Sequence, residues 1–197
     1  MKPTLFPAFI KLAGRACVVV GAGSVAESKI ASLLESGAQV TVIAPNAMDE
    51  IKRLAISHRV RWVPRKFLVT DLDRAFLVVV ATSDPDVNRA VFHEAFERGV
   101  LCNSVDDPPN CDFYFPAVVR RGPLQIAIST SGESPALAQR IRREIEDSLD
   151  TSFGDWIDEI GERRREIIAA LPPSDDRKRL LHRLAHSEPR VAQEPKP

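Results

Sequence analysis

The sequence predicts an α/β protein: a Rossmann-like, doubly wound parallel sheet, followed by a small α+β region and a C-terminal helical region. Three observations lead to this fold class. Between residues 16 and 105, short runs rich in β-branched residues alternate with helical stretches, which is typical of parallel strands joined by right-handed crossovers. A glycine-rich loop follows the first of these runs. After residue 106 the alternation stops and a turn-rich segment begins.

The expected strands of the sheet are short and apolar throughout, which indicates that helices cover both faces of the sheet. In chain order they are ACVVV (16–20), QVTVI (39–43), VRWV (60–63), FLVVVAT (76–82) and VLCNSV (100–105). The helices expected between them span 25–36, 47–56 and 86–98.

The second half of the chain follows a different pattern. The apolar runs FYFPAVV and LQIAIST are strand-like, and RRGP between them is typical of a hairpin connection. Ser134 is a suitable N-cap for a helix with Pro135 at its first position, and further helices are expected at 152–171 and 174–186. The polar, proline-rich end should fray. We therefore divide the chain into a dinucleotide-binding domain (1–115), a middle region (116–149) and a helical C-terminal region (150–197).

Charge and cysteine content exclude several classes of protein. Lys plus Arg and Asp plus Glu both number 27, so no overall field favours nucleic acid or an anionic membrane. The three cysteines form no C-x-x-C pair, which argues against a disulfide framework and a zinc site. His182 and His186 are spaced i, i+4 but lack a third ligand, so no metal site is expected. With no signal peptide or membrane span in the sequence, we expect a soluble, cytoplasmic protein.

The loop that opens the first helix predicts a dinucleotide site. Gly21, Gly23 and Ala26 form a G-x-G-x-x-A pattern between a strand and a helix, where the first glycine permits a tight turn and the second lets the backbone approach a pyrophosphate. Amide groups at the helix start, near Ser24 and Val25, would face the anion. The alternative is a structural glycine turn.

The end of the second strand lacks the acidic residue that commonly binds the ribose of NAD. Ile43 and Ala44 are followed by Pro45 and Asn46, and no arginine is present to bind a 2′-phosphate. Asn46 and the backbone near Pro45 could bind the ribose, which keeps NAD as the expected cofactor. A plain turn role for Asn46 is an equal alternative.

Two further segments follow the carboxyl ends of strands, where ligands bind in doubly wound sheets. Thr82 and Ser83 could line the nicotinamide end of a crevice, while Asp84 is most simply a helix N-cap. Asp106 should emerge at the rim of the same crevice, where a carboxylate can accept a proton. Asp106 could equally be an ordinary turn residue, and Asp107 is better explained that way.

A second anion site is expected before the helix that Ser134 caps. Hydroxyl groups, a glycine and a helix start form a suitable cradle. Its residues are Ser129, Thr130, Ser131 and Gly132. Arginines that could pair with carboxylates are Arg120 and Arg121, expected in the hairpin turn, and Arg140, Arg142 and Arg143 on the helix. Most arginines on such a helix are simply solvated.

Several stretches together resemble the precorrin-2 dehydrogenase / sirohydrochlorin ferrochelatase family, of the type found at the N-terminus of sirohaem synthases. They are VVVGAGSVAESK, ATSDPDVN, and the block from NSVDDPPNCDFYFP to STSGESPALAQRIRREIE. The resemblance covers roughly residues 5 to 150. It implies NAD-dependent oxidation of precorrin-2 to sirohydrochlorin, a macrocycle with eight carboxylates, and in some members insertion of Fe²⁺ or Co²⁺.

The resemblance also assigns roles to residues. It implies Asp106 as the functional aspartate, Ser24 and Val25 as phosphate-loop contacts, and Pro45 and Asn46 as contacts on the adenosine side. It further implies a homodimer in which residues 116–149 form the dimerisation region. No methyltransferase segment follows in this sequence, so precorrin-2 is expected to be made elsewhere.

Two other functions are weighed against this one. A non-enzymatic, dimeric NAD-sensing module is compatible with the fold, but it has no evident need for the serine-rich loop and the arginines. A dehydrogenase for a small hydroxy acid fits poorly, because no Tyr-x-x-x-Lys arrangement is present.

Overall fold

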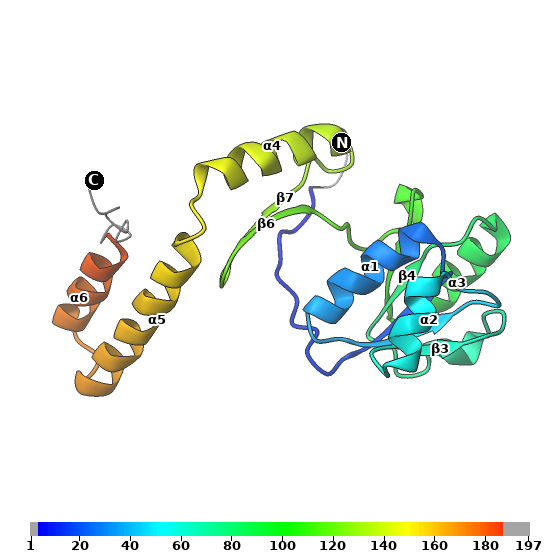
Figure 1. Ribbon diagram of the computed structural model, residues 1–197, viewed down its shortest axis with the longest axis horizontal. Helices are drawn as coiled ribbons and strands as arrows, with labels where there is room; N and C mark the ends of the chain where they lie inside the picture. The colour runs from blue at the N-terminus through cyan, green and yellow to red at the C-terminus, as the bar shows by residue number, and fades with distance from the viewer. Residues whose placement is uncertain (1–3, 187–197) are drawn as a thin grey trace, which may run out of the picture. The chain divides into compact units, whose positions relative to one another are not determined.

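The computed structural model describes residues 4–186. The chain forms two compact units, Met1–Phe115 and Pro116–Pro197 (Figure 1). The frayed end expected at residues 187–197 lies outside the described residues. None of the helices between residues 4 and 186 has the length and apolar character needed to cross a bilayer.

The first unit contains a five-stranded parallel sheet with the order β3-β2-β1-β4-β5. The strands are β1 (Ala16–Val20), β2 (Gln39–Ile43), β3 (Arg61–Val63), β4 (Leu77–Val80) and β5 (Leu101–Ser104). The order reverses between β1 and β4, which is the point where doubly wound sheets bind their ligands. The predicted Rossmann-like fold is therefore confirmed.

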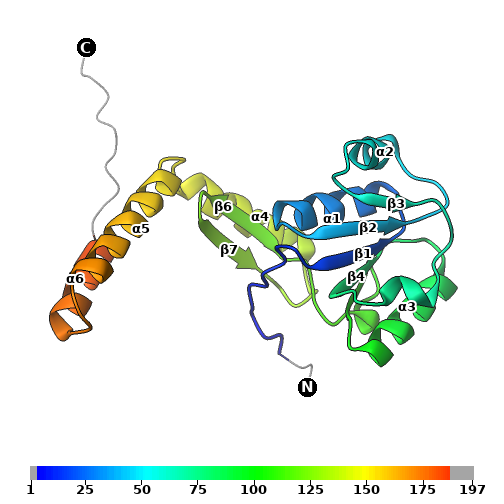
Figure 2. The same ribbon diagram turned by 90° about the horizontal axis from the view of Figure 1, so that it is seen from below.

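Helices cover both faces of this sheet, as the apolar strands predicted. They are α1 (Ser24–Glu35), α2 (Asp49–Ile56) and α3 (Pro85–Arg98), with short 3₁₀ turns η1 (Val69–Leu72) and η2 (Pro108–Asn110). Alternate residues of each strand point to opposite faces. Val19 packs with Ile30 of α1 in one core cluster, whereas Val18 packs with Val91 of α3 in the other. Figure 2 shows the strands lengthwise, with β3, β2, β1 and β4 side by side in this order.

The second unit contains a hairpin and three helices. Strands β6 (Ala117–Arg121) and β7 (Leu124–Ile128) pair antiparallel, and α4 (Pro135–Ser148), α5 (Phe153–Ala170) and α6 (Asp175–Ala185) follow. The Ser134 side chain accepts a hydrogen bond from the Leu137 amide at 3.2 Å, which confirms the predicted N-cap.

The strand-like prediction for FYFPAVV is partly wrong. Residues 113–116 are not in a strand, because the Phe113 carbonyl accepts a 2.8 Å hydrogen bond from the Asn103 side chain and both Phe113 and Phe115 pack on the core of the first unit. The strand starts at Ala117 and runs through Arg120 and Arg121. The two arginines therefore belong to the strand, and Gly122 and Pro123 form the turn.

Candidate functional site

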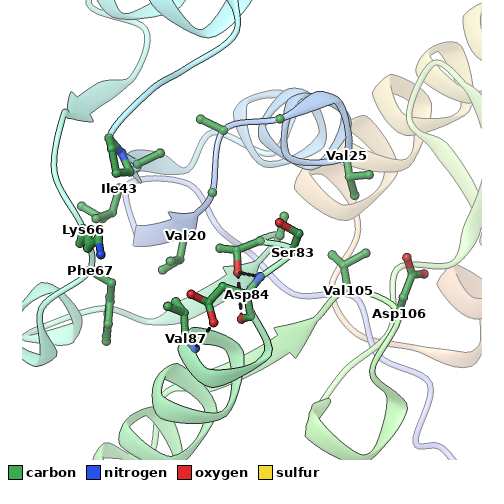
Figure 3. Close-up of a pocket in the computed structure, with 17 residues that line it drawn as sticks. Val20, Val25, Ile43, Lys66, Phe67, Ser83, Asp84, Val87, Val105 and Asp106 are labelled. Atoms are coloured by element: carbon green, nitrogen blue, oxygen red, sulfur yellow. Dashed lines mark hydrogen bonds between the residues drawn. The ribbon is translucent and has the colours of Figure 1, made fainter.

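The crevice at the switch point is a cavity of ≈ 590 Å³ inside the first unit, at the carboxyl ends of β1, β2, β4 and β5 (Figure 3). This size lies within the range of about 300–1,000 Å³ that is usual for ligand pockets. Figure 3 shows two ends. Ile43, Lys66 and Phe67 lie at one end, and Val25, Val105 and Asp106 lie at the other.

The glycine loop forms one wall of the crevice. Gly21 has φ +107°, and a β-carbon there would come within 2.2 Å of the Ala81 carbonyl oxygen, so only glycine fits. Around Gly23 a β-carbon would meet nothing within 4 Å. The loop therefore closes tightly against β4 at its first glycine and leaves open space at its second, as a pyrophosphate cradle requires.

The start of α1 faces this open space without a side-chain cap. Gly23 is the N-cap residue and supplies no side-chain hydrogen bond, so the first amides of the helix are left for another acceptor. Val25 lines the crevice, whereas Ser24 is exposed and is not among its lining residues. Ala26 is fully buried, which lets α1 pack closely on the sheet.

The end of β2 presents no acid to a ribose. Pro45 lines the crevice, and Asn46 is exposed beside it without lining it. The Ala44 carbonyl is occupied, because it accepts a 3.0 Å hydrogen bond from the indole of Trp62. This wall therefore offers a cofactor apolar surface and backbone more than charge.

Lys66 and Phe67 also line this end, and the sequence reasoning did not find them. They lie in the loop after β3, which Arg65 and Asp71 hold in place. The Arg65 guanidinium makes two hydrogen bonds to the Asp71 carboxylate, at 2.7 and 2.6 Å, and the Leu68 amide donates to the same carboxylate at 2.8 Å. The position of Lys66 shortly after an expected parallel strand could have identified it as a residue of the crevice.

The segment after β4 supplies the middle of the crevice. Thr82, Ser83 and Asp84 all line it. The Asp84 carboxylate accepts hydrogen bonds from the amides of Asp86 and Val87, at 3.0 and 3.3 Å, which confirms its N-cap role. The Thr82 hydroxyl donates to the Asn88 side chain at 2.6 Å, and this hydrogen bond fixes the orientation of the hydroxyl group.

Asp106 lies at the crevice end that Val25 and Val105 border. Its side chain is exposed, and its backbone has φ +60°, in the left-handed region that aspartate tolerates better than most residues. The crevice therefore brings the glycine loop and this carboxylate together. Asp107, by contrast, is bound to the Asn110 side chain at 2.7 Å, which supports its assignment as a turn residue.

The loop beneath Asp106 is held by Cys111 and Asp112. The Cys111 thiol donates to the carbonyls of Ser104 and Asp107, at 3.1 and 3.3 Å, and burial raises its pKa. The Asp112 carboxylate accepts from the Cys102 amide at 2.9 Å. Cys111 therefore has a packing role, as does the fully buried Cys102, whose pKa burial raises to about 12.

The predicted anion cradle lies in the second unit. Ser131 and Gly132 have φ +52° and +83°, and the loop is internally hydrogen-bonded. The Thr130 hydroxyl accepts from the Ser134 amide at 3.1 Å, and the Ser129 hydroxyl accepts from the Ser131 amide at 3.1 Å. Both hydroxyls keep a proton to donate.

The arginines of the second unit divide by role. Arg121 donates to the carbonyls of Glu146 and Leu149, at 2.6 and 3.0 Å, and so joins the hairpin to the end of α4. Arg142 pairs with Glu146. Arg140 pairs with Glu144 on an exposed face, and Arg120 and Arg143 are exposed. Arg121 and Arg142 are therefore structural.

Within residues 4–186, no three His, Cys, Asp or Glu side chains are grouped so that they could hold a metal ion. His182 and His186 are both exposed on and beside α6.

Two family models match the chain. One, described as "Putative NAD(P)-binding", matches residues 8–117, and the other, described as "Sirohaem biosynthesis protein central", matches residues 121–148. Siroheme synthase from Neisseria meningitidis serogroup C is 40% identical over 175 residues, which are 89% of this chain and 36% of that protein. Siroheme synthase 1 from Yersinia enterocolitica is 40% identical over 174 residues, 88% of this chain and 37% of that protein.

One solved structure is similar to this chain along most of the length of both proteins. It is SirC, a precorrin-2 dehydrogenase, with a TM-score of 0.78 and 31% identity over 91% of this chain and 89% of SirC. The chain spans little more than a third of the curated siroheme synthases, but nearly all of SirC.

The parallel sheet, glycine loop and open crevice define a dinucleotide-binding Rossmann protein. The sequence and structural relatives are more specific: the chain belongs to the precorrin-2 dehydrogenase family, and it also matches part of the siroheme synthases. This confirms the resemblance found in the sequence.

Proposed function

We propose that the chain is an NAD-dependent precorrin-2 dehydrogenase that oxidises precorrin-2 to sirohydrochlorin in sirohaem biosynthesis. One observation carries the proposal: Asp106 and the glycine loop line one crevice. A family relationship alone would support the fold, but this geometry supplies both a cofactor cradle and a base beside it.

The residues of the crevice fit a dinucleotide. The open space at Gly23 and the uncapped start of α1 suit a pyrophosphate. The apolar wall around Phe67 and Pro45 suits an adenosine, and Thr82, Ser83 and Val105 border the opposite end. NAD, when bound, supplies the hydride acceptor.

Oxidation of precorrin-2 removes one hydride and one proton from the macrocycle. Bound NAD would accept the hydride, and the proton requires a base at the same end of the crevice. Asp106 has the position for that role, and its exposed carboxylate needs little reorganisation to accept a proton. The remaining task of the protein is to hold two large anionic ligands in register.

A turnover assay tests the proposal. Mixing the protein with precorrin-2 and NAD should produce NADH absorbance, and none should appear without NAD. We expect Asp106→Asn to lower kcat by about a hundredfold or more, because asparagine tolerates the same backbone conformation but cannot accept the proton. NAD affinity should stay within about twofold of wild type.

The matched control is Asp107→Asn, which keeps an acceptor for Asn110 and should leave kcat unchanged. Turnover that proceeds equally well without NAD contradicts the dehydrogenase proposal. Equal kcat in the two aspartate variants removes Asp106 from the mechanism.

The NAD-sensing alternative makes a different prediction. A sensor binds NAD but not the macrocycle, whereas the dehydrogenase binds both. Calorimetry with sirohydrochlorin separates them.

Insertion of Fe²⁺ or Co²⁺ into sirohydrochlorin is a second activity that would need the same base for the inner pyrrole protons. An insertion assay corrected for the spontaneous reaction, again with Asp106→Asn, tests it.

We also propose a homodimer and a cytoplasmic location. Support for the dimer comes from the second unit, where the only buried apolar side chains within residues 116–186 are Ala117, Val119 and Ala138. A two-stranded sheet with so small a core is marginal alone. The cytoplasm is favoured by three free thiols, two of them buried.

A further inference from the structure

Lys29 lies beside the proposed catalytic end of the crevice and has no role so far. It is on α1, four residues after Val25, so the two side chains share one face of the helix. Val25 lines the crevice next to Asp106. Lys29 is half-buried, and its ammonium lies 4.3 Å from the centroid of the Phe115 ring. The ring therefore holds this cation about one helical turn from Val25, which lines the crevice.

The Lys29 ammonium has unused hydrogen-bonding capacity. Among the residues that the structure describes, it contacts the Phe115 ring and interacts with the Asp106 charge, but it donates no hydrogen bond and forms no close ion pair. An ammonium group has three donors, and leaving them unmatched in a partly buried place costs free energy. Burial lowers the pKa of Lys29, while Asp106 acts in the opposite direction.

Lys52, another lysine of the first unit, is used differently. It is exposed and donates to Asp49 at 3.0 Å within α2. The donors of Lys29 are instead unmatched, so an incoming anion could accept hydrogen bonds from them. The anion must approach next to Asp106, which is itself negative. A carboxylate bound there therefore gains from Lys29 and is kept apart from Asp106 by it.

We propose that Lys29 is a substrate-binding residue that pairs with a peripheral carboxylate of the tetrapyrrole. The inference rests on the proposed function, which supplies a substrate rimmed with carboxylates. The pair would fix the rotation of the macrocycle, so that one edge faces the nicotinamide and Asp106. Lys29 would thus decide which tetrapyrrole edge reacts and would discriminate against macrocycles that lack the carboxylate.

The test compares Lys29→Met with Lys29→Arg. Methionine keeps the apolar stem that packs on Phe115 but removes the charge, and arginine keeps the charge. We expect Lys29→Met to raise the KM for precorrin-2 by about tenfold, as the loss of one charged hydrogen bond predicts. Lys29→Arg should restore most of that loss. NAD affinity should be unchanged in both, and the dependence of KM on salt should weaken in Lys29→Met.

Lys52→Met is the matched control, because it removes an exposed lysine remote from this role and should leave KM as in wild type. If the wild-type protein turns over precorrin-2 and the KM of Lys29→Met is within twofold of wild type, the substrate-binding role of Lys29 is wrong but the dehydrogenase proposal stands. A separate binding measurement, which uses the fluorescence of sirohydrochlorin, distinguishes the Lys29 proposal from the dehydrogenase proposal. If the wild-type protein neither turns over precorrin-2 nor binds sirohydrochlorin, both proposals are wrong. If it binds sirohydrochlorin without turning over precorrin-2, and Lys29→Met weakens that binding, the substrate-binding role of Lys29 is supported and the dehydrogenase proposal is contradicted.

Discussion

The residues of the site lie mostly just after the carboxyl ends of β1, β2, β4 and β5. Gly21, Thr82 and Asp106 each follow a strand that the sequence marks clearly, and parallel strands bring such positions to one edge. Lys66 and Lys29 could not be predicted in the same way. One is in a loop whose path depends on Arg65 and Asp71, and the other is on a helix face that only packing orients.

Gly23 offers a clean test of cofactor binding. Its φ of −87° and ψ of −173° suit alanine, and a β-carbon there meets no protein atom within 4 Å. We expect Gly23→Ala to keep the thermal midpoint but to weaken NAD binding by about tenfold or more, because the methyl group occupies the space of the pyrophosphate. Calorimetry measures the affinity.

Gly161→Ala is the matched control for that variant. Gly161 lies inside α5, where a β-carbon would make only an ordinary 3.5 Å contact with Arg165. The Gly161→Ala variant should leave NAD affinity unchanged. Wild-type affinity in Gly23→Ala would mean that the loop is a structural turn and not a phosphate cradle.

At the scale of elements, apolar runs located the strands, but one boundary depended on side-chain contacts far along the chain. The aromatic residues 113–115 alternate as a strand would, yet Asn103 binds the Phe113 carbonyl and the rings pack on the first core. The hairpin therefore starts later than predicted, at Ala117. Local pattern cannot distinguish an apolar run that pairs from one that packs.

The loop after β3 is an element whose position depends on one ion pair. The Asp71 side chain is mostly buried, at 9% exposure, and receives three hydrogen bonds. Burial alone raises the pKa of Asp71, but the bonds from Arg65 and Leu68 outweigh it, so the net pKa is lowered. The stabilisation is therefore complete above the ordinary aspartate pKa, and it is lost as the pH falls below that value.

We expect Asp71→Asn to lower the free energy of unfolding at pH 7 by about 1–3 kcal/mol and to weaken NAD binding several-fold, since Lys66 and Phe67 lose their support. The loss of stability on acidification should also be smaller in the variant than in wild type. Asp49→Asn, in an exposed pair with Lys52, should leave stability nearly unchanged, because solvent screens such a pair. Chemical denaturation at pH 7 and pH 3 measures both, and equal stability of the two variants contradicts the bracing role.

At the scale of the whole molecule, the two units differ in how completely they bury apolar surface. The first has clusters on both faces of its sheet, whereas the second buries three apolar side chains within residues 116–186. The second unit instead depends on polar links, such as Arg121 to Glu146 and Leu149. This imbalance is the physical reason to expect a second copy of the chain.

The dimer is tested by mass and by stability. Light scattering should give twice the chain mass of 21.8 kDa at micromolar concentration. The thermal midpoint should rise with protein concentration, because unfolding is then coupled to dissociation. A monomer at all concentrations, with a midpoint that does not depend on concentration, contradicts the proposal.

The parallel sheet, the glycine loop and the caps at Asp84 and Ser134 could be predicted from sequence alone, because each depends on a few neighbouring residues and their backbone preferences. The sequence also ranked Asp106 as a candidate, but left it equal to a turn aspartate. The fold was needed to place that carboxylate in the same crevice as Gly23, and to bring Lys29 onto Phe115, which lies 86 residues further along the chain. Contacts between residues so distant in sequence arise when strands pair and helices pack on them, and no local pattern encodes them.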